Sequence, residues 1–387
     1  MRPHVSCNGL LGRGALLLAW ALVALPRSGY ADEKPDTSQA WLDAELLKTR
    51  KARIRAYPFA FYTPETEVAV GAGGIVTFYT APDRLLRPSK VTLSAYYSTR
   101  KQYEITLRPE LYMVGNTLFL SARLNFGDFV HKFWGIGRDS PDIDTENYDS
   151  RSWGAWVNFQ FPPLLKFMPH NKSGVIYDFR RYQVINPRDN PHLKEGEVTG
   201  RRGGYNSGIG VTLVWDSRDH IFYPTKGGFY QGKAIFYMRA IGSSFNFGTY
   251  EIDLRWYFSL SRKRHSVLAI QAFGKLASGN PPFYELPGFG SSTIMRGYFT
   301  GRYRDKTFVA GQVEYRTRVW WRFGLVGFAA LGDVQQTLTD FDPFDAKFSL
   351  GAGLRFLFDE KQQVNVRMDI GFGRDTSGVY FGLEEAF

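Results

Sequence analysis

The chain has 387 residues, of which 44% are apolar, and carries a formal net charge of +11 at pH 7. The first 31 residues hold three arginines and no acid, so residues 32–387 carry +11 − 3 = +8. The basic residues are dispersed among acids, which argues against nucleic-acid binding and suits an anionic membrane surface. The single cysteine, Cys7, lies in the same leader, so the remaining chain has no thiol for a disulfide, a zinc site or a nucleophile.

The leader has the layout of a secretory signal. An apolar run from Ala15 to Leu25 follows two arginines and precedes the small-x-small sequence Gly29-Tyr30-Ala31. This run is too short for a membrane-spanning helix, which needs about 20 apolar residues. We therefore predict a signal peptide over residues 1–31, cut near Ala31, and export of the remainder to the periplasm.

A short polar segment follows over residues 32–55. Asp36 and Gln39 have the spacing of a capping box ahead of Trp41 and Leu42, so we predict one short helix in this periplasmic segment. Two roles fit the pattern, of which the tether is the simpler. The segment is either a tether or a plug or docking helix at the mouth of the domain that follows.

From residue 56 onward, apolar and polar residues alternate with a period of two. Near the end of the chain, one face of the pattern holds Val364, Val366, Met368, Ile370 and Phe372, and the other holds Asn365, Arg367 and Asp369. Such alternation indicates strands with one apolar face. The runs last roughly ten residues, which is the length that crosses a bilayer at a tilt and exceeds the five or six typical of soluble sheets.

The pattern predicts an all-β fold, a transmembrane antiparallel β-barrel over residues 56–387. We count sixteen candidate strands, and an even number is expected of bacterial barrels. They cover residues 56–62, 66–80, 88–99, 101–113, 116–127, 149–161, 173–185, 205–216, 226–241, 245–260, 263–278, 305–319, 322–335, 346–358, 362–373 and 377–387. Pro58, Pro64 and the stretch from Gly71 to Gly74 weaken pairing in the first two, so fourteen strands is the alternative.

Three connections are long, over residues 129–148, 186–203 and 279–304, and the last contains the most distinctive motif, Arg296-Gly297-Tyr298. With this triplet ahead of the last strands, the chain resembles the bacterial surface antigen family, the BamA/TamA superfamily of outer-membrane assembly and translocation barrels. The resemblance implies that the loop folds back into the lumen of the barrel.

The resemblance also implies partners for Arg296. In the family, the loop arginine meets acids on the two strands that follow it, which match Glu314 and Asp333 here. An arginine in a protein-lined lumen needs such carboxylates, which its guanidinium can bind bidentately. Near Asp333 the chain departs from the family, because Leu331 and Gln335 replace the usual aromatic and glycine. We expect Arg296 to bind both acids, the alternative being a solvated loop arginine.

A second motif looks like the strand-turn-strand signature of the same family. It comprises Asp216, Arg218, Asp219, Pro224 and Gly227. Side-chain hydrogen bonds from the two aspartates and the conformational freedom of the glycine account for these residue types without any chemistry. We therefore expect a structural role for this turn motif.

The end of the chain resembles the signal by which outer-membrane barrels are recognised for assembly. Phe381, Leu383 and Phe387 carry this resemblance, which implies that the barrel-assembly machinery of the host inserts the chain. Glu385 departs from the pattern by placing a charge where an apolar residue is usual. Near the membrane interface a charge costs little, so we expect no large effect from it.

The resemblance implies a function in outer-membrane protein insertion or substrate translocation. Family members with that role carry periplasmic domains ahead of the barrel, and residues 32–55 have no room for one. This departure favours the alternative, a solute-conducting pore or a structural barrel. A third possibility is a separate periplasmic partner that docks on residues 32–55.

No motif of an enzyme, a cofactor site or a metal site is present. The histidines outside the leader fall in predicted loops and turns, without a nucleophile elbow or paired-histidine spacing. An acidic loop lacks the full calcium pattern and is expected to be solvated; it contains Asp139, Asp142, Asp144, Glu146 and Asp149. We expect the barrel to be surrounded by outer-membrane lipid and lipopolysaccharide, with client membrane proteins as further partners. Trp320 and Trp321 are expected in the interfacial belt of aromatic residues.

Overall fold

The computed structural model describes residues 52–387, except 82–85, 144, 163–170, 262–264 and 361–362. The predicted signal peptide lies outside the described residues. So does most of the predicted periplasmic segment, with the capping pair Asp36 and Gln39.

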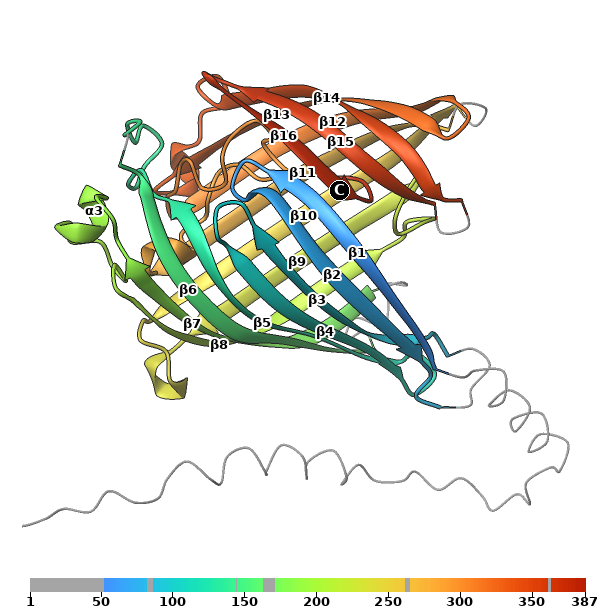
Figure 1. Ribbon diagram of the computed structural model, residues 1–387, viewed down its shortest axis with the longest axis horizontal. Coiled ribbons are helices and arrows are strands. Elements are labelled where there is room, and N and C mark those ends of the chain that lie inside the picture. Colours follow the sequence, from blue (N-terminus) through green and yellow to red (C-terminus); the bar gives the residue numbers. More distant parts are fainter. Residues whose placement is uncertain (1–51, 82–85, 144, 163–170, 262–264, 361–362) are drawn as a thin grey trace, which may run out of the picture. The chain divides into compact units, whose positions relative to one another are not determined.

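Sixteen antiparallel strands form one sheet, in which each strand pairs with its neighbours in the sequence (Figure 1). They are β1 (Arg53–Thr63), β2 (Glu67–Phe78), β3 (Ser89–Ser98), β4 (Tyr103–Met113), β5 (Leu118–Lys132), β6 (Asn147–Phe161), β7 (Asn171–Asn186), β8 (Gly203–Asp216), β9 (Gly227–Tyr237), β10 (Phe247–Ser261), β11 (Ser266–Gly279), β12 (Thr307–Trp320), β13 (Phe323–Gln335), β14 (Lys347–Asp359), β15 (Val364–Gly373) and β16 (Thr376–Leu383). This number confirms the prediction of sixteen strands rather than fourteen. β1 begins at Arg53, inside the segment predicted to precede the barrel.

The described helices are short and lie in connections. They are α3 (Pro191–Lys194) and the 3-10 turns η1 (Arg239–Ile241), η2 (Phe283–Glu285) and η3 (Leu338–Asp340). None of them is long and apolar enough to cross a membrane.

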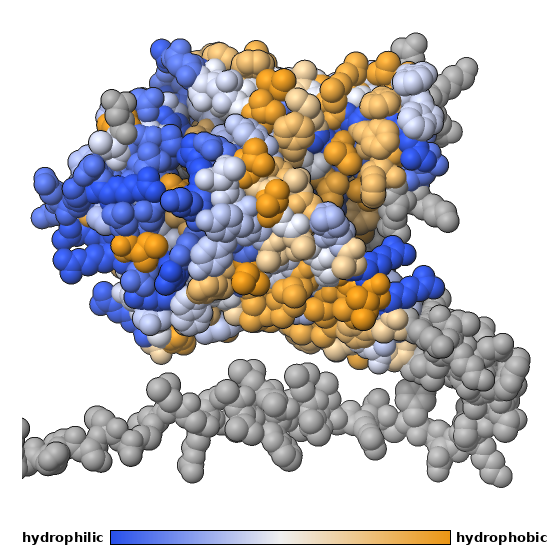
Figure 2. Space-filling view, in the orientation of Figure 1, coloured by the Kyte–Doolittle hydropathy of each residue, from blue (hydrophilic) through white to orange (hydrophobic). Residues whose placement is uncertain are grey.

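The two faces of the sheet differ as the alternation predicts. On β8, Ile209, Val211 and Leu213 are exposed on the outer face, whereas Thr212 between them is buried on the lumenal face. Apolar side chains form a broad band over the strands, and hydrophilic side chains gather at one end, where the long loops lie (Figure 2). The band is the surface that meets lipid.

Connections at the two ends of the barrel differ in length. Residues 133–146, 187–202 and 280–306 make long connections at the same end, while β12 and β13 are joined at the opposite end by Trp321 and Arg322 alone. Barrels of this kind have short periplasmic turns and longer extracellular loops, so the long connections mark the extracellular end. Trp320 and Trp321 are exposed at the periplasmic end, where an interfacial belt is expected.

The barrel has one seam, between its first and last strands. β1 and β16 lie against each other, but among the described residues they share no hydrogen-bonded ladder. In Figure 1 the blue β1 and the red β16 face each other across this seam. β16 is the shortest strand, with eight residues, and residues 53–58 of β1 are all exposed. We call this line of missing pairing the seam.

Candidate functional site: the lumenal loop and its seat

The connection between β11 and β12, residues 280–306, folds into the barrel and is called the lumenal loop here. Its apolar side chains pack against the inner faces of β12 and β13. The cluster comprises Phe289, Ile294, Met295, Tyr298, Phe308, Ala310, Ala330 and Val334. The predicted folding of this loop into the lumen is therefore confirmed.

Arg296 is buried at the centre of the loop's contact with the wall. Its guanidinium donates to Glu314 Oε2 on β12 at 2.5 Å and to Asp369 Oδ2 on β15 at 2.7 Å. The ring of Phe328 on β13 lies against the guanidinium, with its centroid 3.4 Å from Cζ. Two charge-assisted hydrogen bonds and a cation–π contact thus hold one side chain.

The expectation that Asp333 binds Arg296 is wrong. Asp333 forms ion pairs with Arg138 at 2.9 Å and Lys347 at 3.2 Å instead. The register of β12 and β13 gives the reason, because Glu314 lies opposite Phe328. Asp333 is five residues farther along β13, which at about 3.4 Å per residue places it roughly 17 Å away from that level. A guanidinium bound to Glu314 does not reach it.

Asp369 takes the place expected for Asp333, and only a weak sequence signal pointed to it. It alternates with Arg367 on the polar face of β15, but so do charged residues on several other strands. Asp369 also accepts hydrogen bonds from Arg355 at 2.5 Å and Arg367 at 3.1 Å. Arg296 therefore joins a buried network of alternating charges.

The network continues through Glu314 and Glu385. Glu314 accepts from Arg316 Nε at 2.8 Å, and Glu385 accepts from Arg355 Nε at 2.7 Å. The members are Arg296, Glu314, Arg316, Arg355, Arg367, Asp369 and Glu385. Charges buried in this way are tolerable only when each has partners, so the network fixes which lumenal wall receives the loop.

Glycines let the backbone of the loop approach β15 closely. Gly297 has φ +110°, a conformation that favours glycine, and a Cβ there would lie 2.8 Å from the backbone of Phe372. On the strand side, a Cβ at Gly371 would lie 2.6 Å from the carbonyl carbon of Arg296. The loop and the strand therefore pack backbone against backbone, which explains the glycine in the Arg-Gly-Tyr triplet.

Hydrogen bonds attach the triplet to the last three strands. The hydroxyl of Tyr380 on β16 accepts from Gly297 N at 3.0 Å, and Thr376 donates to Gly297 O at 3.0 Å. Tyr298 donates to the carbonyl of Phe348 on β14 at 3.0 Å. The third residue of the motif thus supplies both apolar packing and a specific anchor.

Four residues beyond Arg296, the same loop reaches the first hairpin. The backbone N–H and the hydroxyl of Thr300 both donate to Glu65 Oε1, at 3.0 Å and 2.8 Å. Glu65 lies in the turn between β1 and β2, on the other side of the seam from β16. The lumenal loop therefore bridges the seam at the extracellular end.

The turn motif between β8 and β9 is held together by side-chain hydrogen bonds. Arg218 donates to both carboxylate oxygens of Asp216, at 2.8 Å and 2.9 Å, and Asp219 accepts from Thr225 N at 2.8 Å. Burial by itself raises the pKa of Asp219, but hydrogen bonds from Thr225 and Lys226 outweigh burial and hold that pKa below its ordinary value. Pro224 lies in the same turn, between these hydrogen-bonded residues.

Replacing Gly227 by valine is expected to destabilise the barrel by about 1–3 kcal/mol, because φ at this position is +88° and a Cβ would collide with the carbonyl oxygen of Ser217. The midpoint of the heat-induced mobility shift of the folded barrel in electrophoresis measures this loss. Gly232→Ala is the control, since a Cβ there meets nothing within 4 Å. Equal midpoints for the two variants would contradict the structural role.

The C-terminal residues divide between the two faces of the barrel. Phe381 and Leu383 are exposed on the outer face, the latter 62% exposed. Phe387 turns inward instead and packs in the lumen against Tyr223 of the turn motif and Tyr257. Glu384, with φ +67°, follows the last strand residue and redirects the chain.

Glu385 was expected to be a low-cost charge near the membrane interface, which is wrong. Its side chain is 2% exposed, and it accepts hydrogen bonds from Arg355 and from Asn365 Nδ2, each at 2.7 Å. The inward turn of the chain after Leu383 brings this carboxylate into the arginine network.

Two of the acids considered for calcium pair with separate cations, and Asp144 lies outside the described residues. Glu146 pairs with Lys132 at 2.6 Å, and Asp149 pairs with Arg188 at 2.6 Å. Within the described ranges, no group of three histidine, cysteine or acidic residues is placed to hold a metal ion.

Comparisons with known proteins agree with this architecture. The model of the Omp85 superfamily domain matches residues 75–387. The chain superposes on BamA from Haemophilus ducreyi lacking POTRA domains 1–3 with a TM-score of 0.60 and 12% identity, over 87% of this chain and 70% of that one. For CdiB from Acinetobacter baumannii the TM-score is 0.55 and the identity 12%, over 86% of this chain and 59% of that one. None of the curated proteins matches the chain.

Proposed function

The chain belongs to the Omp85 superfamily, and from that premise we propose that a client polypeptide enters or crosses the outer membrane at the seam between β1 and β16. The observation that carries the proposal is the combination of an unpaired seam with a loop that bridges it. Every other neighbouring pair of strands shares a ladder. The seam is therefore the place where the wall opens with the fewest hydrogen bonds broken.

The edges at the seam have the properties of a template for another strand. An unpaired strand edge presents a row of backbone N–H and C=O groups that an incoming chain can pair with. β1 offers eleven residues on that edge, and its neighbour β2 pairs with it along the whole length. A client β-strand can thus add to β1 while β1 stays part of the barrel.

The lumenal loop sets how easily the seam opens. Its Arg-Gly-Tyr triplet is attached to β14, β15 and β16, whereas Thr300 is attached to Glu65 beside β1. The Arg296–Asp369 ion pair and the Gly297–Tyr380 hydrogen bond are buried, and the Tyr298–Phe348 hydrogen bond is partly buried. The contact with Glu65 is exposed and consists of two hydrogen bonds to one oxygen. We infer that opening breaks the Thr300–Glu65 contact and leaves the loop seated on the last strands.

A reversible cross-link over this contact tests the proposal. Glu65→Cys and Thr300→Cys, joined by a short reducible bismaleimide in cells whose only copy is this variant, are expected to halt the appearance of newly made outer-membrane proteins. Reduction of the linker is expected to restore it. The measurement is mass spectrometry of pulse-labelled outer membranes. The chain supplies no competing thiol outside the leader.

A matched pair provides the control. Thr99 donates to Glu67 at 3.3 Å at the same end of the barrel, but both residues lie on one side of the seam. The same linker between Thr99→Cys and Glu67→Cys is expected to change nothing. Equal effects of the two cross-links, or no effect of either, would contradict opening at the seam.

The partners follow from the same proposal. We propose that the outer face meets lipid and lipopolysaccharide, that Phe381 and Leu383 are read by the host's assembly machinery, and that residues 32–55 dock a separate periplasmic partner. Pull-down with and without residues 32–52, a deletion that leaves β1 whole, tests the last point. Equal recovery of partners from both forms would rule it out.

A further inference from the structure

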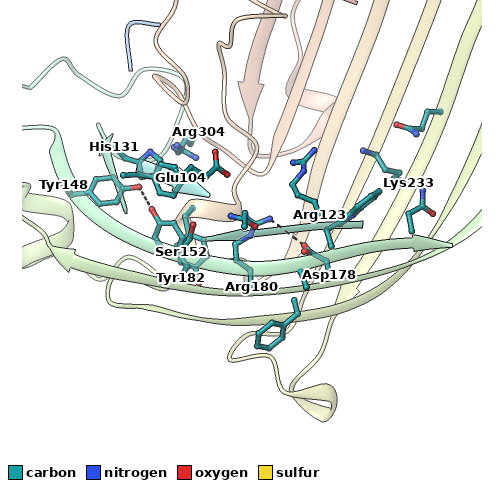
Figure 3. Close-up of a pocket in the computed structure, with 18 residues that line it drawn as sticks. Glu104, Arg123, His131, Tyr148, Ser152, Asp178, Arg180, Tyr182, Lys233 and Arg304 are labelled. Carbon is teal, nitrogen blue, oxygen red and sulfur yellow. Dashed lines mark hydrogen bonds and ion pairs between the residues drawn. The ribbon is translucent and has the colours of Figure 1, made fainter. Parts of the chain in front are cut away.

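A cavity of about 610 Å³ lies in the lumen between the wall of β4–β9 and the lumenal loop. Its charged lining residues come from strands and loop alike and face the same space (Figure 3): Glu104, Arg123, Asp178, Arg180, Lys233 and Arg304. The cavity is separate from the seam and from the ion pairs of Arg296. Its volume is within the range of sites that hold small molecules.

Some of these cations are already neutralised. Arg180 pairs with Glu285 at 2.8 Å and lies 3.8 Å from Asp178, and Lys233 pairs with Glu251 at 2.6 Å. Asp178 also accepts a hydrogen bond from the hydroxyl of Tyr237 at 2.6 Å. The charges of these groups are therefore balanced within the wall of the cavity.

Arg123 is different, because another arginine faces it across the sheet. Leu107 on β4 pairs with Leu124 on β5, and Glu110 pairs with Ser121, so the continuous register sets Arg108 opposite Arg123. Leu107 and Leu124 are exposed on the outer face, which turns both arginines toward the lumen. Like charges directly opposite each other on a sheet are destabilising.

Neither arginine has a carboxylate partner. Among the described residues, Arg108 and Arg123 form no ion pair and no side-chain hydrogen bond, and both are exposed to the lumen. Arg304, at the end of the lumenal loop, lines the same cavity, and its Nε is buried without a hydrogen-bond partner. The two lining carboxylates, Glu104 and Asp178, attract Arg123 without forming an ion pair with it. Arg123 and Arg304 thus line the cavity without an ion pair to a described residue, and Arg108 lies next to Arg123 on the neighbouring strand.

We propose that this wall binds a small soluble anion with phosphate or carboxylate groups between Arg108 and Arg123. Guanidinium groups suit such anions because their planar N–H donors match the oxygens in pairs. The ring of Trp156, which lies opposite Arg123 on β6, adds an apolar side to the site. A lipid headgroup is a less suitable ligand, since the arginines face away from the bilayer.

The test is isothermal titration of the purified full chain in phosphatidylcholine vesicles with inorganic phosphate, and separately with citrate, at fixed ionic strength. We expect saturable binding, weakened about tenfold or more in Arg108→Gln and in Arg123→Gln, because each loses a charge-assisted hydrogen bond. Arg322→Gln, which removes an arginine from a periplasmic turn, is expected to bind as the unaltered chain does.

A second readout separates binding from damage to the fold. Without added anion, Arg123→Gln is expected to raise the midpoint of the heat-induced mobility shift, because it relieves the repulsion from Arg108. Phosphate is expected to raise the midpoint of the unaltered chain and not that of the variant. Binding that is absent in the unaltered chain, or equal in all three variants, overturns the proposal. So does a rise produced by phosphatidylglycerol vesicles alone, which assigns the site to lipid.

Discussion

Replacing Arg296 by alanine is expected to destabilise the barrel by about 3–5 kcal/mol, the cost of leaving a buried charge without its partner. Glu314 and Asp369 both lose their shared cation, although Arg316 and Arg355 still contact them. The lumenal loop then keeps its apolar contacts but loses the ion pairs that fix its position. The midpoint of the heat-induced mobility shift measures the loss of stability.

Two comparisons make this expectation specific. Arg374→Ala removes an arginine that is 81% exposed and is expected to leave the midpoint unchanged. Asp369→Asn is expected to release the loop, whereas Asp333→Asn is expected to leave it seated, because Asp333 pairs with Arg138 and Lys347 instead. A larger effect of Asp333→Asn than of Asp369→Asn on loop position would contradict the geometry.

Gly371→Val is expected to unseat the lumenal loop without removing any charge. A side chain at this position meets the backbone of Arg296 and Gly297, which has no rotamer to move, so β15 and the loop must separate. Such overpacking typically costs about 1–3 kcal/mol. The measurement is limited proteolysis from the extracellular side, with faster trypsin cleavage after Arg302 expected in the variant.

Gly327→Val is the matched control for this substitution. Gly327 lies on β13, and a Cβ there meets nothing within 4 Å. This substitution introduces the same β-branched side chain into β13, which β14 separates from β15. If both variants are cleaved at the same rate, the backbone contact between Gly371 and the loop does not hold the loop in place.

The strand pattern could be predicted because each strand is exposed to different surroundings on its two faces. Val366 and Ile370 face outward while Arg367 and Asp369 face the lumen, so the alternation reports the wall of a barrel directly. The long connections and the folding of residues 280–306 into the lumen were likewise predicted, the latter from resemblance. The strand pattern and the long connections depend on local sequence alone.

The partners of Arg296 depend on the register between strands, which alternation leaves open. Sliding β13 along β12 by two residues changes which residue lies opposite Glu314 without changing any residue's face. The sequence therefore did not distinguish Asp333, far along β13, from Asp369 on β15. The inward course of Glu385 and Phe387 was missed for a related reason. The chain turns inward at Glu384, whose φ is positive, and the pattern of apolar and polar residues does not reveal that backbone conformation.

The most direct measurement is depletion of this protein in its own host, followed by quantitative proteomics of the outer membrane alongside solute uptake. If the seam serves client polypeptides, we expect selected outer-membrane or secreted proteins to be lost while the uptake of small solutes changes little. An unchanged protein inventory with altered uptake of small anions would contradict that account and make the chain a pore built on an Omp85 barrel.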